Sequence, residues 1–128
     1  MDKQYQALTD FIPSAARIAE RQSAPDIPLW DRGGAESRIV DRFVDTFYSW
    51  MSEHPETGLD YYRDILAENG LSTDILDKAD TEKCGARCVL AMFFAAIRAN
   101  RFSDGFLYGL FLDGTALKWL RRLEKLDR

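Results

Sequence analysis

Apolar residues recur every three or four positions along almost the whole chain, and no segment alternates apolar and polar residues as a half-buried strand does. This periodicity predicts an all-α protein. Pro13 falls inside the first apolar segment and is expected to kink that helix or split it into two. The first helical segment is expected to run from residue 2 to a linker at 23–34. The other helices are expected at 35–53, 60–69, 72–78, 81–100 and 103–112, and from residue 115 onward.

The segment 81–100 is expected to be the centre of the fold. From Cys88 to Ile97 it contains ten consecutive apolar residues. A helix that is apolar on every side must be covered on every side by other helices. The run is too short for a membrane crossing, which needs about 20 apolar residues. The sequence therefore predicts one domain, residues 1–128, built as an orthogonal bundle of about six to seven helices around this central helix.

Charge and composition narrow the possible partners. The 128 residues carry a formal net charge of −4, which argues against direct binding to nucleic acids or anionic membranes. Residues 53–82 contain nine acidic and two basic side chains, whereas residues 98–128 contain seven basic and four acidic ones. The amino terminus has no basic start followed by an apolar core, so we expect a cytoplasmic protein with reduced thiols.

A motif in the carboxyl third resembles a known family. It reads Arg98-x-x-Arg101-Phe102-x-Asp104-Gly105 and is followed by Gly114 and by Leu120-x-Arg122-Leu123. This pattern is similar to that of a bacterial family called domain of unknown function 6508. Family members typically have a glutamate at the position of Asn100. The resemblance implies a helical bacterial domain, and the family offers no activity to carry over.

The charged residues of this motif form the first candidate site. Arg98, Arg101 and Asp104 lie at the junction of two predicted helices, and Arg122 on the last helix is expected to reach the same corner. Arginines there can donate to the free carbonyls at a helix end, which would make the corner a structural clasp. Alternatively, the guanidinium groups, with Tyr61 or Tyr62 nearby, form a pocket for a small anion or carboxylate.

The other polar groups indicate no catalytic residue, no metal site and no cofactor. Cys84 and Cys88 lie four residues apart on what we expect to be one helix. We interpret them as reduced core thiols. With His54 as the single histidine, the chain lacks the four ligands of a structural zinc site. His54 is instead expected to contact the carboxyl end of its helix. The paired carboxylates fit solvated helix faces: Asp41 with Asp45, and Asp60 with Asp64.

Three tryptophans bear on possible contacts. Trp50 and Trp119 fall off the predicted inward stripes and are expected to be partly exposed, which makes Trp119 a candidate partner contact. Leu29 and Trp30, in the linker, are expected to lie over the core as a lid.

The sequence favours a non-enzymatic module that binds another protein. One alternative is an acidic inhibitor that mimics nucleic acid and occupies the groove of a DNA- or RNA-binding protein. Another is a small-ligand or anion-binding protein, or an enzyme, that uses Arg98, Arg101 and Asp104. Both a monomer and a homodimer remain open, and the uneven charge is compatible with head-to-tail self-association.

Overall fold

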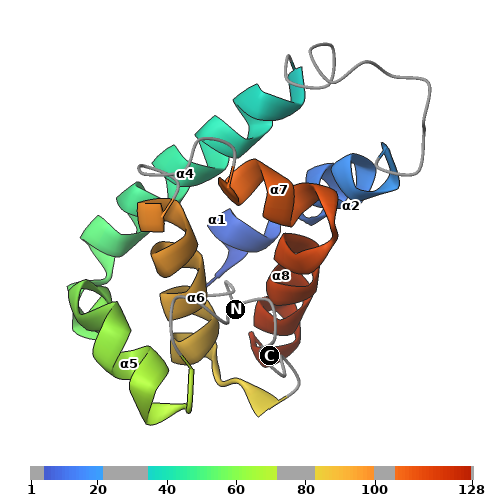
Figure 1. Ribbon diagram of the computed structural model, residues 1–128. Helices are drawn as coiled ribbons and strands as arrows, with labels where there is room; N and C mark the ends of the chain where they lie inside the picture. The colour runs from blue at the N-terminus through green and yellow to red at the C-terminus, as the bar shows by residue number, and fades with distance from the viewer. Residues whose placement is uncertain (1–4, 22–34, 72–82, 100–105, 128) are drawn as a thin grey trace.

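The predicted all-α fold is confirmed. The computed structural model describes residues 5–21, 35–71, 83–99 and 106–127, and within these ranges the chain forms helices and no strand (Figure 1). Two short 3₁₀ helices, η1 (Pro55–Thr57) and η2 (Leu59–Tyr61), connect α4 to α5. The α-helices are α1 (Gln6–Thr9), α2 (Ile12–Arg21), α4 (Ala35–Glu53), α5 (Tyr62–Glu68), α6 (Ala86–Ala99), α7 (Phe106–Leu112) and α8 (Thr115–Leu126).

Helix α6 is buried on all sides, as its composition predicts. Every residue from Cys88 to Ile97 is buried. Helices α5, α7 and α8 pack around it, with α5 and α8 on opposite sides (Figure 1). In the part of the chain that the structure describes, no helix is both long and apolar enough to span a bilayer.

Helix α6 begins later than predicted. The Val89 amide donates to the Gly85 carbonyl at 3.0 Å, so Gly85 immediately precedes the first helical residue, Ala86. Glycine is a poor helix former but is well tolerated at a helix boundary. Cys84 therefore lies outside the helix that contains Cys88, and the expectation that both cysteines share one helix is wrong.

Aromatic contacts tie the other helices to α6. The Phe43 ring on α4 lies 5.1 Å from Phe93 of α6 and 5.5 Å from Phe111 of α7, measured between ring centroids. Phe11, between α1 and α2, meets the same ring at 5.3 Å in an edge-on geometry. On the far side, Phe93 meets Trp119 of α8 at 5.1 Å, with the ring planes 86° apart. Phe43 and Phe93 thus connect five parts of the chain: the segment at Phe11 and helices α4, α6, α7 and α8.

Trp50 and Trp119 are buried, so the expectation that they are partly exposed is wrong. Only 3% of Trp50 and 1% of Trp119 is accessible to solvent. The predicted inward stripe of the last helix, Leu117, Leu120, Leu123 and Leu126, steps by three residues and drifts around an α-helix of 3.6 residues per turn. The residues of α8 that are buried are instead spaced three, one and three positions apart: Ala116, Trp119, Leu120 and Leu123.

The ends of several helices match their predicted signals. Pro13 separates α1 from α2 and occupies the first turn of α2, where its missing amide hydrogen costs no hydrogen bond. Helix α4 has the predicted bounds, and α8 starts at the predicted Thr115. The Tyr5 amide donates to Asp127 Oδ2 at 2.9 Å, which joins the start of the described chain to its end. The short helix predicted at 72–78 and the Leu29 and Trp30 lid lie outside the described residues.

Replacing Phe43 tests the aromatic core. Phe43→Ala is expected to lower the free energy of unfolding by about 3 to 5 kcal/mol, because it removes a fully buried ring from the junction of α4, α6 and α7. Tyr61→Ala, at a side chain 69% exposed, should change it by no more than about 0.5 kcal/mol. Urea denaturation followed by circular dichroism measures both. Equal losses would contradict the aromatic core.

Candidate functional site

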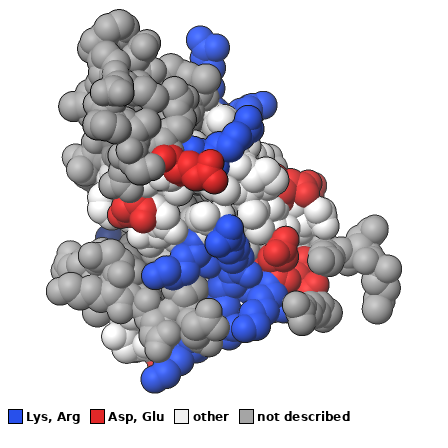
Figure 2. Space-filling model, turned by 90° about the vertical axis from the view of Figure 1, so that its right-hand side faces the viewer, with Lys and Arg blue, Asp and Glu red and all other residues white. Residues whose placement is uncertain are grey.

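Helix α8 presents a row of cationic side chains opposite its buried stripe. Lys118, Arg121, Arg122 and Lys125 follow the spacing i, i+3, i+4 and i+7, which places them on one side of the helix. We refer to these four residues as the α8 basic face. Arg122 is half-buried and the other three are exposed. Figure 2 shows the Lys and Arg side chains gathered in a broad patch on the side of the molecule that carries α8.

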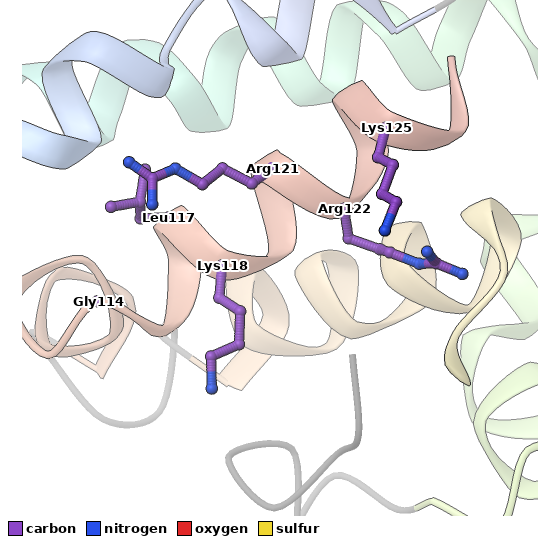
Figure 3. Close-up of a pocket in the computed structure, with 6 residues that line it drawn as sticks. All are labelled: Gly114, Leu117, Lys118, Arg121, Arg122 and Lys125. Carbon is purple, nitrogen blue, oxygen red and sulfur yellow. The ribbon is translucent and has the colours of Figure 1, made fainter. Parts of the chain in front are cut away.

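The α8 basic face surrounds a shallow concavity of about 330 Å³ (Figure 3). Besides the four cations, the described residues that line it are Gly114 and Leu117. Gly114 has a φ of +85°, a backbone conformation that favours glycine, and it allows the chain to turn directly from α7 into α8. The half-buried Leu117 adds an apolar surface among the charges. The concavity therefore suits a group that combines negative charge with apolar contact.

Arg122 is held in place by the segment that precedes α6. Its Nε donates to the carbonyl of Cys84 at 2.9 Å, and Figure 3 shows the side chain extending away from Arg121. Arg121 and Lys118 are exposed, and among the residues that the structure describes neither has a hydrogen bond or an ion pair with another side chain. One cation of the face is thus anchored, while two project their charge into solvent.

The two cysteines behind Arg122 are buried and form no disulfide, as expected for core thiols. Burial, together with a hydrogen bond to Cys84, raises the pKa of Cys88 to about 12. Because the thiolate is the reactive and metal-binding form, the Cys88 thiol is a poor nucleophile and a poor ligand at neutral pH. Within the described part of the chain, no group of three or more His, Cys, Asp or Glu side chains is arranged to hold a metal ion.

A second charged surface lies on the other side of α6. Exposed carboxylates occur at every fourth residue: Glu56 lies in η1, Asp60 in η2, and Asp64 and Glu68 in α5. We refer to these four residues as the α5 acidic face. Tyr61 lies beside Asp60, and 69% of its area is exposed. Among the described residues, it is the one large hydrophobic side chain that is exposed.

His54 makes the contact predicted for it. Its Nδ1 lies 2.8 Å from the Trp50 carbonyl in the last turn of α4, and its ring stacks on Trp50 with 4.1 Å between centroids. The backbone around it is also engaged: Thr57 Oγ1 donates to the His54 carbonyl at 2.8 Å, and Arg87 Nε donates to the Thr57 carbonyl at 2.9 Å. His54 thus belongs to the junction that leads from α4 to α5.

The family model described as "Family of unknown function (DUF6508)" matches residues 2–128. The chain belongs to this family. The resemblance expected from the carboxyl-terminal motif is therefore confirmed for this DUF6508 protein. No curated protein and no solved structure matches the chain.

Arg122 of the DUF6508 protein does not lie beside Arg98 as predicted. Arg98 is half-buried in the last turn of α6, whereas Arg122 bonds to Cys84, just before the first turn. From Ala86 to Arg98 the helix rises about 18 Å, so Arg122 does not reach the corner of Arg98, and that expectation is wrong. Arg101 and Asp104 lie outside the described residues.

Two further candidates have clear positions in the DUF6508 protein. Tyr61 is exposed and accessible to a partner. Trp119 is packed against Phe93 and offers no surface for one. Sequence reasoning passed over Lys118, Arg121 and Lys125. Their spacing on the helix predicted from residue 115 was a signal that could have grouped them with Arg122.

Arg122 and Arg121 provide a matched pair of substitutions. Each change to alanine removes one positive charge from the same helix, but only Arg122 donates to a buried part of the backbone. Arg122→Ala is expected to lower the free energy of unfolding by about 1 to 2 kcal/mol. Arg121→Ala should alter it by less than about 0.5 kcal/mol. Thermal denaturation compares the two, and an equal effect would mean that the bond to Cys84 does not anchor α8.

Proposed function

We propose that this DUF6508 protein is a non-enzymatic binding module of the bacterial cytoplasm that recognises an acidic surface of a partner protein through the α8 basic face. The observation that carries the proposal is the grouping of Lys118, Arg121, Arg122 and Lys125 around a concavity that also contains Leu117. Arginine guanidinium groups form paired hydrogen bonds with carboxylates, and lysines add mobile positive charge.

The rigidity of α8 supports a binding role. Trp119 is packed into the core and Arg122 is bonded to the Cys84 carbonyl, so the backbone that carries the cations is fixed before a partner arrives. A surface that is already ordered loses little conformational entropy on binding. The α8 backbone therefore needs no rearrangement to present these cations to an acidic partner.

Charge and thiol chemistry support a protein partner and the cytoplasm. The net charge of −4 and the α5 acidic face would repel the long phosphate backbone of a nucleic acid, whereas a local acidic protein surface can meet α8 alone. Two buried cysteines that form no disulfide suit a reducing compartment. The raised pKa of the Cys88 thiol supports a structural role for it over a nucleophilic one.

The α5 acidic face supports a second candidate function. Its exposed carboxylates every four residues could occupy a basic nucleic-acid groove of a target protein, with Tyr61 as an apolar contact. In that case the partner would be a DNA- or RNA-binding protein and would contact α5. The position of contact therefore separates the two candidate functions.

Photo-crosslinking from defined positions tests the proposal. Benzoylphenylalanine is placed at Glu124, beside the α8 basic face, at Ala67 on α5, or at Asp41 on α4 as a control, since all three positions are exposed. After irradiation in lysate of the source organism at low salt, position 124 is expected to capture a discrete protein at least about tenfold more than position 41. Lys118→Glu with Arg121→Glu should abolish that capture, as should high salt, which screens exposed charges.

Two outcomes would overturn the proposal. One is capture at position 124 that does not exceed capture at position 41, or that survives reversal of both charges. The other is capture confined to Ala67, which would favour the nucleic-acid mimic if the captured protein binds DNA or RNA.

A further inference from the structure

The two charged surfaces cannot meet within one molecule. Helices α5 and α8 pack against α6 from opposite sides (Figure 1). Because their buried residues face the core, the α5 acidic face and the α8 basic face point outward on opposite sides. Helix α8 rises about 10 Å from Lys118 to Lys125, and α5 rises about 9 Å from Tyr62 to Glu68, with Asp60 just before it. Two surfaces of opposite charge and similar length are thus held apart by the core of the molecule.

We infer that a second copy of this chain docks head to tail, with Tyr61 and the α5 acidic face of one copy on the α8 basic face of the next. The inference rests on the proposed function, because both use the same face of α8. It deepens that proposal by naming one acidic protein surface that fits, namely that of the chain itself.

The shapes and chemistry of the two surfaces match. Tyr61 projects from the surface with 69% of its area exposed and is flanked by carboxylates. The concavity on α8 has a volume of about 330 Å³ and combines Leu117 with surrounding cations. An aromatic ring seated there would contact the Leu117 side chain and present its face to a guanidinium, while Asp60 and Asp64 pair with the lysines and arginines around it.

Electrostatics favour the head-to-tail arrangement over a symmetric one. A symmetric dimer has a single interface, and the two faces lie on opposite sides of the molecule, so only one of them can take part. Then α8 would face α8 or α5 would face α5, and like charges would be opposed. A head-to-tail contact pairs opposite charges at every interface. It leaves one face free at each end, so it builds chains or closed rings of copies. Because exposed ion pairs are individually weak, the assembly should be weak and sensitive to salt.

Charge exchange between two variants tests this inference. In the first variant, Lys118→Glu, Arg121→Glu and Lys125→Glu leave the α8 face with three acidic side chains and one basic one. In the second, Asp60→Lys, Asp64→Lys and Glu68→Lys leave the α5 face with three basic side chains and one acidic one. Each variant alone opposes like charges at every head-to-tail contact, whereas a mixture restores opposite charges at both kinds of contact. Sedimentation velocity at about 0.01 M salt should show assemblies for the natural chain and for the mixture, and monomers for either variant alone.

Tyr61 provides a second, independent arm of the test. Tyr61→Ala is expected to weaken self-association by about tenfold, as at other aromatic interface anchors, while Tyr61→Phe, which keeps the ring, should retain most of it. Circular dichroism confirms that every variant is folded. A natural chain that stays monomeric at low salt up to millimolar concentration overturns the inference, as does assembly that persists in both charge-reversed variants alone.

The failure of this inference can be distinguished from failure of the proposed function. The Asp60→Lys, Asp64→Lys, Glu68→Lys variant keeps the α8 basic face intact, so it should still crosslink a partner protein from position 124 although it no longer self-associates. Monomers that crosslink a different protein leave the proposed function standing and remove only the second copy. Loss of capture in that variant would assign the contact to α5 and contradict both.

Discussion

The fold of this DUF6508 protein depends on the complete burial of α6. Its residues from Cys88 to Ile97 have no exposed side, so other helices must cover it on every side. Phe93 of α6 contacts Phe43, which holds α4 against α6. Phe93 also contacts Trp119, which holds α8 against α6. Burial of these large aromatic side chains outweighs their conformational entropy and sets the positions of the surrounding helices.

The charged surfaces follow from this core. Because Trp119 and Leu120 face inward, the helical repeat places Lys118, Arg121 and Lys125 on the outside of α8. Burial of Ile65 and Leu66 in the same way turns the carboxylates of α5 toward solvent on the other side of α6. The rotation of each helix about its own axis is therefore fixed by packing, and this rotation decides which charged side chains face solvent.

The sequence predicted the helices better than the site. The bounds of α4 follow from its apolar periodicity, and the burial of α6 follows from its unbroken apolar run. Both signals lie within a single helix. The rotation of α8 was misjudged because leucines at every third position suggested an inward stripe that an α-helix cannot maintain. The bond from Arg122 to Cys84 joins residues 38 positions apart, and no local pattern encodes it. The motif suggested that Arg122 joins Arg98, but the length of α6 keeps them apart.

Recognition of acidic protein surfaces by the α8 basic face, as we propose it, is tested most directly with a short polyglutamate peptide. The peptide is titrated into the ¹⁵N-labelled protein at low salt, and the amide resonances are followed by NMR. We expect shifts concentrated between Gly114 and Lys125, with small changes in α5, and their loss when Lys118 and Arg121 are replaced by glutamate. Shifts that are absent, or that are spread evenly over the other helices, would contradict it.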